Sequence, residues 1–254
     1  MTANTLADWL AAEPFTLTLS SGFFGFYAHA GMLAALHERG VQPARITGAS
    51  AGALVGSLRA AGFAPPAIIE ELLKLERHHF WDPAPGLGLL RGALFRERLQ
   101  QILPVHRFEQ CVIPLALSVH QWSGRRTRVL AAGELVPAIY ASCAVPLLFH
   151  PLRIDGALCA DGGVGDRWGL AGVANGERVF YHHLGSRSPW RRRDDPGLKI
   201  PHRANLAALE LIDIPRSGPS KMALGRQIVA LARERTLQAL TRPVGSETAL
   251  FRTQ

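Results

Sequence analysis

Apolar runs of strand length alternate with segments of helical spacing along the first part of the chain. Residues 15–19 and 43–48 are predicted to be short strands, and residues 29–39 and 51–61 follow them with small and apolar residues at helical spacing. Strands that alternate with helices pack as a sheet covered by helices. The pattern therefore predicts an α/β fold and not a helical bundle.

The same alternation continues toward the C-terminus. An Asp-Gly pair between two apolar runs favours a tight turn, so residues 152–161 are predicted to form a hairpin that turns at Asp155–Gly156. No internal repeat or long linker interrupts the chain, so we expect one domain over residues 1–254, with a motif-bearing core at about 15–185 and a helical C-terminal part at about 204–254. Further helices are predicted at 65–80, 94–103, 135–142 and 221–240, and further strands at 112–118, 127–131 and 179–184.

The pentapeptide Gly48-Ala49-Ser50-Ala51-Gly52 has the pattern G-x-S-x-G and lies between a predicted strand and a predicted helix. A serine at such a turn holds its hydroxyl exposed on backbone that only small neighbours tolerate. The free N–H groups of the following helix favour negative charge that develops beside it. Ser50 is therefore a candidate nucleophile with Gly48 and Gly52 as motif glycines. The alternative is that Ser50 is an ordinary N-cap.

A loop of small residues follows the first predicted strand and precedes a predicted helix. In this arrangement several backbone N–H groups face an anion, which in a serine hydrolase is the tetrahedral oxyanion. The candidate donors are the amides of Ser21, Gly22 and Phe23, with Gly25 as a further motif glycine. A nucleotide-phosphate loop is disfavoured, because neither G-x-x-x-x-G-K-[ST] nor a full G-x-G-x-x-G is present. A βα turn without a ligand remains the other interpretation.

A carboxylate followed by two glycines, Asp161-Gly162-Gly163, ends the predicted hairpin. Asp161 would project from the end of a strand, which suits a fixed base. Asp155 is a rival, but its place between two apolar runs favours a turn. Asp166 is expected to hold the same loop through backbone hydrogen bonds.

Taken in order, the small-residue loop, G-x-S-x-G and D-G-G resemble the patatin-like phospholipase family, over about residues 15 to 185. The loop is similar to that of the triglyceride-lipase and adiponutrin branch and of bacterial patatin-like proteins. The resemblance implies a three-layer α/β/α sandwich and hydrolysis of lipid esters by a Ser-Asp dyad, with Ser50 as nucleophile and Asp161 as base. This chain departs from the family in carrying Ser20 and Ser21 where glycines are usual, and Phe24 where many members have Arg or Lys.

Histidine offers an alternative mechanism, a Ser-His-Asp triad. In the α/β-hydrolase order the histidine follows the acid, and three histidines do: His182, His183 and His202. The first two lie in a predicted strand, where packing is more common than catalysis. His29 and His150 lie near the motif segments and are candidates for lining a pocket, but a structural role is favoured for each.

Metal or cofactor chemistry has little support in the sequence. There is no H-E-x-x-H and no C-x-x-C pair, so we expect no metal and no cofactor. Cys111, Cys143 and Cys159 lie in apolar runs and are expected to be buried reduced thiols. The apolar and Pro/Gly-rich residues 80–90 are a candidate lid over the pocket.

Charge and hydropathy bear on location and partners. The formal net charge is +8, and residues 187–195 form a basic loop with Trp190. Trp beside cations suits an anionic membrane surface, so peripheral membrane contact is expected, with a solvated loop as the alternative. No nucleic-acid motif accompanies the basic patch, so no nucleic-acid partner is expected. Polar residues interrupt every apolar run before about 18 residues and no signal peptide is recognised, so a cytoplasmic protein is expected.

Three functions follow from these features. The leading one is a serine acyl hydrolase that cleaves lipid esters through an acyl-enzyme on Ser50. The second is a catalytically weak lipid- or partner-binding protein on the same scaffold, which the altered loop around Ser20, Ser21 and Phe24 motivates. The third is an acyltransferase, in which an alcohol or thiol replaces water as the acceptor.

Overall fold

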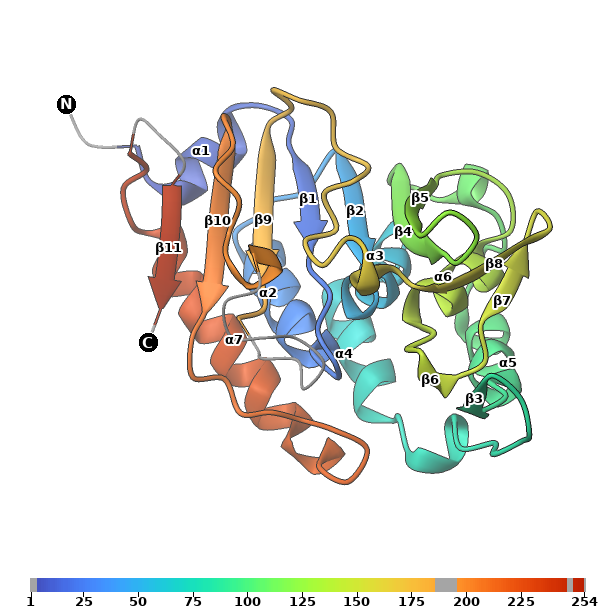
Figure 1. Cartoon of the computed structure of the whole chain (residues 1–254). Coiled ribbons are helices and arrows are strands. Elements are labelled where there is room, and N and C mark those ends of the chain that lie inside the picture. Colours follow the sequence, from blue (N-terminus) through green and yellow to red (C-terminus); the bar gives the residue numbers. More distant parts are fainter. Residues whose placement is uncertain (1–3, 186–195, 246–248, 254) are drawn as a thin grey trace.

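A computed structural model describes residues 4–185, 196–245 and 249–253. Within these residues a nine-stranded sheet has the order β11-β10-β9-β1-β2-β4-β8-β7, with β5 paired to β4 (Figure 1). The pairs from β11 across to β4 are parallel, whereas β5, β8 and β7 pair antiparallel. The strands are β1 Thr16–Leu19, β2 Arg45–Ala49, β4 Leu115–Gln121, β5 Arg126–Leu130, β7 Leu152–Ile154, β8 Ala157–Asp161, β9 Val179–His183, β10 Leu206–Leu211 and β11 Ala249–Thr253.

Helices cover the sheet, as the sequence pattern predicts. Close packing between them depends on small residues. A Cβ at Gly31 of α2 would lie 2.8 Å from the Ala232 Cβ of α7, and closer still to the Val229 carbonyl oxygen. Helices α2, α3, α4 and α7 consequently form one packed layer. The helices are α1 Leu6–Ala12, α2 Phe26–Glu38, α3 Ala51–Ala60, α4 Pro65–Leu73, α5 Ala93–Ile102, α6 Leu135–Cys143 and α7 Gly225–Leu240.

The two faces of the sheet can be followed from the alternation of residues along β9. Phe180 belongs to the core under the helices, whereas its neighbours Val179 and Tyr181 pack with Leu170 and Val173 on the opposite face. That opposite face is covered by described residues between β8 and β10, among them Leu170, Val173 and Ile200. This part of the chain contains the short 3-10 helices η3 (Gly162–Val164) and η4 (Pro196–Leu198). The α/β/α arrangement is thus confirmed, with one thick helical layer and one thin layer.

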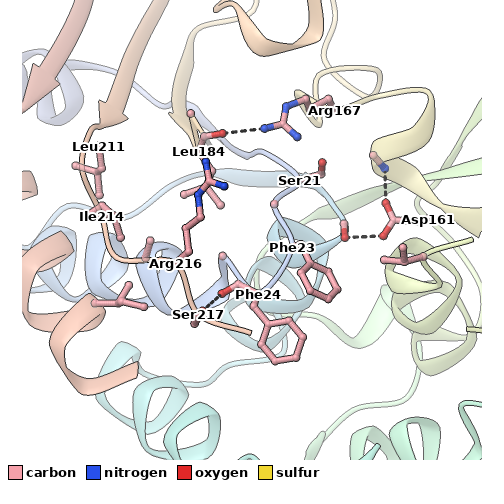
Figure 2. Close-up of a pocket in the computed structure, with 18 of the residues that line it drawn as sticks. Ser21, Phe23, Phe24, Asp161, Arg167, Leu184, Leu211, Ile214, Arg216 and Ser217 are labelled. Atoms are coloured by element: carbon pink, nitrogen blue, oxygen red, sulfur yellow. Dashed lines mark hydrogen bonds between the residues drawn. The ribbon is translucent and has the colours of Figure 1, made fainter. Parts of the chain in front are cut away.

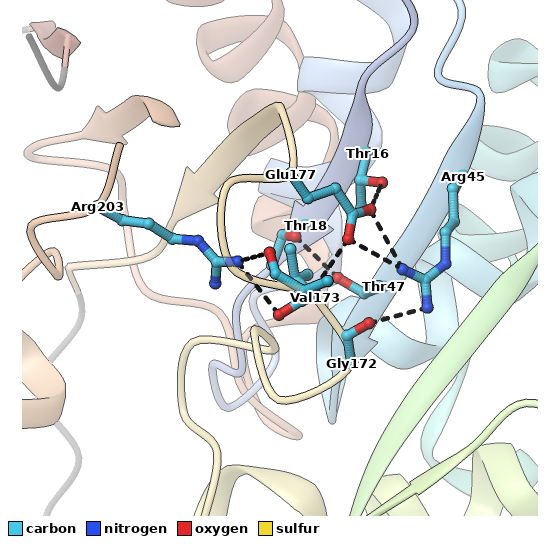
Figure 3. A network of polar contacts seen from close by, with 9 residues as sticks. Thr16, Thr18, Arg45, Thr47, Gly172, Val173, Glu177 and Arg203 are labelled. Carbon is cyan, nitrogen blue, oxygen red and sulfur yellow. Dashed lines mark hydrogen bonds and ion pairs between the residues drawn. The ribbon is translucent and has the colours of Figure 1, made fainter. Parts of the chain in front are cut away.

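A polar cluster ties the thin layer to the sheet (Figure 3). The Glu177 carboxylate accepts hydrogen bonds from the Thr16 hydroxyl of β1 and from Arg45 of β2. Arg45 also donates to the Gly172 carbonyl at 2.8 Å. Arg203 donates to carbonyls of the same segment, including that of Val173 at 3.2 Å. The segment that follows Asp161 is therefore held across β1 and β2.

Two predicted elements need correction. The helix predicted at 65–80 ends at Leu73, and the chain continues through a turn into the 3-10 helix η1 (Arg77–His79). The C-terminal part predicted to be helical contains α7 but also the strands β10 and β11. The sequence of β10, Leu-Ala-Ala-Leu-Glu-Leu, consists of helix-favouring residues, so its strand conformation comes from pairing with β9 and β11.

Candidate active site

Ser50 occupies a strained turn between β2 and α3. Its backbone has φ 52° and ψ −119°, a conformation that residues with a Cβ seldom adopt. The flanking glycines allow the turn to pack tightly. A Cβ at Gly48 would lie 2.7 Å from the Gly52 carbonyl carbon, and a Cβ at Gly52 would collide with the Leu19 carbonyl of β1. Ser50 occupies the N-cap position of α3, but its side chain makes no capping hydrogen bond, so it is not an ordinary N-cap.

The Ser50 hydroxyl is directed at Asp161. Ser50 Oγ donates to Asp161 Oδ2 at 2.6 Å, and the other carboxylate oxygen accepts from the Gly163 amide at 2.7 Å (Figure 2). Both side chains come from strand ends that flank β4 in the sheet. Ser50 is 8% exposed and Asp161 is 5% exposed, so water has little access to the pair.

The two glycines after Asp161 allow close approach on both sides of the turn. A Cβ at Gly162 would collide with the Ser118 carbonyl of β4, and a Cβ at Gly163 would collide with the Ser21 hydroxyl. The D-G-G motif therefore lets the end of β8 press against β4 and against the loop after β1. That contact sets the position of the Asp161 carboxylate.

The other aspartates take the structural positions predicted for them. Asp155 lies in the β7–β8 turn with φ 48°, next to Gly156 with φ 76°, and its carboxylate pairs with Arg128. Asp166 accepts from the Ser118 hydroxyl at 2.6 Å and from three backbone amides, those of residues 169 to 171. Asp166 thus holds the loop that follows Asp161.

Sequence reasoning missed Ser142 at the end of α6. Its hydroxyl accepts from the Ser50 amide at 3.0 Å and donates to the Ser118 carbonyl at 2.7 Å. It thereby satisfies the backbone of the strained Ser50 turn. Its role depends on α6 packing against β4, a contact that the sequence does not display.

The loop between β1 and α2 brings backbone amides to the same site, but the predicted set of three oxyanion donors needs correction. The Ser21 amide donates to the Arg167 carbonyl at 2.8 Å, so it is not free to bind an oxyanion. Within the described residues, the amides of Gly22 and Phe23 donate no hydrogen bond, and both residues line the same cavity as Ser50. The predicted three-donor hole is reduced to these two amides.

A cavity of about 1330 Å³ opens at Ser50. Its walls come from the loop after β1, from residues 145–148, from the chain around Asp161, and from residues 210–217 after β10. Figure 2 shows Phe23 and Asp161 on one side and the Leu211–Ser217 segment on the other. Ligand pockets are commonly about 300–1,000 Å³, so the cavity can hold a long flexible molecule. Apolar and cationic residues both line it: Leu184, Leu211, Ile214, Ile228, Arg167 and Arg216.

The histidines do not complete a triad in the described residues. His29 Nδ1 lies 2.8 Å from His182 Nδ1, and His183 bonds to the Tyr181 hydroxyl at 2.7 Å. Burial lowers the pKa of His29 and of His183 to about 4, and it lowers the pKa of His182 well below its usual value. None of these rings, nor His202, lines the cavity. His29 therefore has the structural role that the sequence favours over lining the pocket.

The candidate lid packs elsewhere. His150 Nε2 lies 3.0 Å from the Gly88 carbonyl oxygen and 3.3 Å from that of Ala84, so it fastens residues 80–90 instead of lining the cavity. Strand β3 (Gly88–Leu90) pairs with β6 (Leu147–Phe149) in a separate two-stranded sheet. Phe80 and Leu90 share a small core with α6. The lid prediction is therefore not supported for this conformation.

Thiol chemistry is disfavoured at the site. Cys143 Sγ lies 3.2 Å from the Ser50 carbonyl oxygen, but burial raises the pKa of this thiol well above its usual value and the Asp161 charge raises it further. All three cysteines are free, although only Cys159 is fully buried. In the described ranges, no three His, Cys, Asp or Glu side chains group as metal ligands. The predicted basic cluster at 187–195 lies outside the described residues, within which no helix has the length and apolar character to cross a bilayer.

The chain is similar to known proteins in sequence and in fold. A family model described as patatin-like phospholipase matches residues 17–170. Uncharacterized NTE family proteins of Mycobacterium bovis and Mycobacterium tuberculosis are each 34% identical over 163 residues, which covers 62% of this chain but only 45% of theirs. The crystal structure of VipD from Legionella pneumophila is similar in fold, with a TM-score of 0.53 at 16% identity over 90% of this chain and 67% of that one. Because the family model spans more than half of its residues, the chain belongs to the patatin-like phospholipase family.

Proposed function

We propose that the protein hydrolyses carboxylic esters of lipids through an acyl-enzyme on Ser50. The observation that carries the proposal is the 2.6 Å hydrogen bond from the Ser50 hydroxyl to the Asp161 carboxylate at a strained strand-to-helix turn. Family membership supports the lipid substrate, and the large, partly apolar cavity is compatible with it.

In this mechanism Asp161 takes the hydroxyl proton as Ser50 Oγ attacks the ester carbonyl. The amides of Gly22 and Phe23 and the N-terminus of α3 stabilise the resulting oxyanion. When the intermediate collapses, Asp161 returns the proton to the departing alcohol and the acyl group stays on Ser50. Water then attacks the acyl-enzyme by the same steps in reverse, releasing the fatty acid and restoring both side chains.

A carboxylate is a weak base in water, with an ordinary pKa of about 3.9. Two features of the site support its use here. The carboxylate is almost excluded from solvent, and its contact with the hydroxyl is direct, within the roughly 2.6–3.2 Å that proton transfer requires. Of the candidate histidine bases, His182 and His183 are hydrogen-bonded to other side chains, and His202 does not line the cavity.

The first test compares wild type, Ser50→Ala and Asp161→Asn on short and long p-nitrophenyl esters. We expect each variant to lose at least about a thousandfold in kcat, because nucleophile and base act as a unit. Asp155→Asn is the matched control, since Asp155 lies in the exposed hairpin turn. Circular dichroism checks that each variant is folded. Full activity in folded Ser50→Ala would rule out the acyl-enzyme.

Experiments on the same wild-type and variant proteins distinguish two other functions from ester hydrolysis. A catalytically weak binding protein, which the serines at 20 and 21 and Phe24 motivate, would show no turnover and no labelling of Ser50 by a fluorophosphonate. An acyltransferase would be labelled but would form a new ester or thioester when an alcohol or thiol is added. Product analysis with and without the acceptor distinguishes transfer from hydrolysis.

Peripheral contact with a lipid surface is part of the proposal, and the mouth of the cavity supports it. Three large apolar side chains both line the cavity and reach solvent: Phe23 is 54% exposed, Leu147 72% and Val164 43%. Leu147 also has φ 66°, which is rare for a leucine. We call Phe23, Leu147 and Val164 the mouth residues. A cytoplasmic location stays a prediction.

A further inference from the structure

The residue that precedes the oxyanion loop, Ser20, has its amide, carbonyl and hydroxyl oxygen all engaged. Its amide donates to the His182 carbonyl of β9 at 3.2 Å, and its hydroxyl oxygen accepts from the Leu184 amide at 2.9 Å. Its carbonyl oxygen lies 2.9 Å from His29 Nε2 of α2. Ser20 is thus held by β9 on one side and by α2 on the other.

The direction of the His29 bonds follows from charge and from the nature of the partners. Burial lowers the pKa of His29 to about 4, so the ring is neutral near pH 7 and carries one N–H. A carbonyl oxygen can only accept, so we assign the proton to Nε2, and Nδ1 must then accept. His182 Nδ1, 2.8 Å away, is therefore the donor. The bonds run from His182 through His29 to Ser20.

Apart from its hydrogen bond to His29, the His182 ring has no polar partner among the described residues. Its Nε2 is buried without a hydrogen-bond partner among the described residues. The two rings also meet edge to face, with centroids 4.8 Å apart. A buried polar atom without a hydrogen-bond partner lowers the stability of the fold, so stability alone does not favour a histidine at residue 182. Among the described residues, the one hydrogen bond of the His182 ring is the one it donates to His29 Nδ1.

The hydrogen bond between His29 and Ser20 joins the two ends of the loop that carries the Gly22 and Phe23 amides. The two residues are nine apart in sequence and flank residues 21–25. Inside this closed loop, the Ser21 amide is bound to the Arg167 carbonyl, and the Gly25 amide donates to the Gly22 carbonyl at 2.8 Å. The amides of Gly22 and Phe23 therefore sit in a short segment held at both ends.

We propose that His29 is a positioning residue, whose hydrogen bond to Ser20 holds the Gly22 and Phe23 amides where they stabilise the oxyanion formed at Ser50. The inference rests on the proposed ester hydrolysis. His29 does not line the cavity, so it acts through the loop and not on the substrate. Oxyanion donors work only within a few tenths of an ångström of their optimum, so a loosened loop lowers the rate.

Two amide variants of equal polarity test the role. In His29→Gln the side-chain amide can reach the place of Nε2 and donate to Ser20. In His29→Asn it reaches only the place of Nδ1 and leaves Ser20 without a donor. We expect Asn to lower kcat at least about tenfold with little change in KM, and Gln to keep most of kcat. The inhibition constant of a trifluoromethyl ketone, whose adduct is an oxyanion, should rise in Asn by a similar factor.

Backbone hydrogen exchange of residues 20–25, measured by mass spectrometry, supplies a readout that needs no activity. We expect faster exchange in His29→Asn than in His29→Gln or wild type. Two results would overturn the inference. One is an equal loss of kcat in both variants together with an equal fall in Tm; the other is a His29→Asn variant with the kcat and the hydrogen exchange of wild type. If the backbone amides of residues 20–25 exchange slowly in wild type, but the protein neither hydrolyses esters nor reacts with a fluorophosphonate, the proposed hydrolysis is contradicted. The exchange rates of the two variants still decide whether His29 holds the loop.

Discussion

At the scale of single residues, the two side chains proposed to react differ from the side chains that hold others in place. Ser50 and Asp161 contact each other directly, whereas Ser142, Asp166 and His29 bind the backbone around them. Several of the holding residues are as polar and as buried as the proposed dyad. Burial of a polar residue therefore does not by itself identify a reacting group; its partner does.

Glu177 offers a prediction on stability at this scale. Burial raises its pKa, but hydrogen bonds from Thr16 and the Ala174 amide and the Arg45 charge outweigh that effect and leave the pKa below its ordinary value. A depressed pKa stabilises the fold above the unfolded pKa, and this stability is lost as the pH falls through the folded one. We expect Glu177→Gln to lower the free energy of unfolding by about 1–3 kcal/mol at pH 7.

The measurement is urea unfolding at pH 7 and at pH 3, with the exposed Glu97→Gln as control. The difference between wild type and Glu177→Gln should shrink at pH 3, because the unfolded wild-type chain takes up a proton at this carboxylate and unfolding becomes more favourable. An equal difference at both pH values would show that the charge contributes nothing.

At the scale of elements, the turn from β8 into η3 joins the base to the oxyanion loop. In Gly163→Ala the new methyl group would meet the Ser21 side chain and come within 3.0 Å of Asp161 Oδ1. We expect activity to fall at least about tenfold, since a displaced carboxylate no longer meets the hydroxyl. Adding Ser21→Gly removes the obstructing side chain and should restore part of the activity.

Two glycine controls sharpen this prediction on the same ester assay. Gly162→Ala would collide with the Ser118 backbone, which cannot rotate away, and should lower Tm more than Gly163→Ala does. In Gly245→Ala the new methyl group meets nothing within 4 Å among the described residues, so this variant should change neither activity nor Tm. A Ser21→Gly/Gly163→Ala double variant no more active than Gly163→Ala would contradict the proposed contact.

At the scale of the whole molecule, the cavity mouth is the surface through which a lipid ester would enter. Burying an apolar side chain in a lipid surface is favourable by about 1–2 kcal/mol, which is roughly tenfold in partitioning. On a Ser50→Ala background, we expect Leu147→Ser and Val164→Ser each to weaken binding to mixed phosphatidylcholine and phosphatidylglycerol vesicles by about that factor. Sedimentation with the vesicles measures the bound fraction.

Val112→Ser is the matched control, because Val112 is 68% exposed and does not line the cavity. It should bind vesicles as the Ser50→Ala parent does. If all three serine variants bind equally, the mouth residues do not contact the lipid surface. Pure phosphatidylcholine vesicles then separate an apolar contact, which persists, from attraction by anionic lipid, which is lost.

The sequence by itself was enough to find the elements that carry the motifs. Ser50 could be located because a serine between small residues at a strand-to-helix junction has a local signature, and the glycines at 48, 52, 162 and 163 mark backbone that tolerates no Cβ. The Asp155 turn and the role of Asp166 followed from equally local rules. Such features depend on neighbours in the chain, which the sequence displays.

Only the tertiary structure could decide which distant groups meet. The pairing of β10 with β9 overrides the helical preference of Leu206–Leu211, the Arg167 carbonyl takes the Ser21 amide, and His29 bonds to Ser20 and not to a ligand. Each of these depends on contacts between segments brought together by packing, whose energies outweigh local preference by small margins. The residues of the proposed dyad could therefore be predicted from the sequence, whereas the assignment of each hydrogen-bond donor and acceptor required the fold.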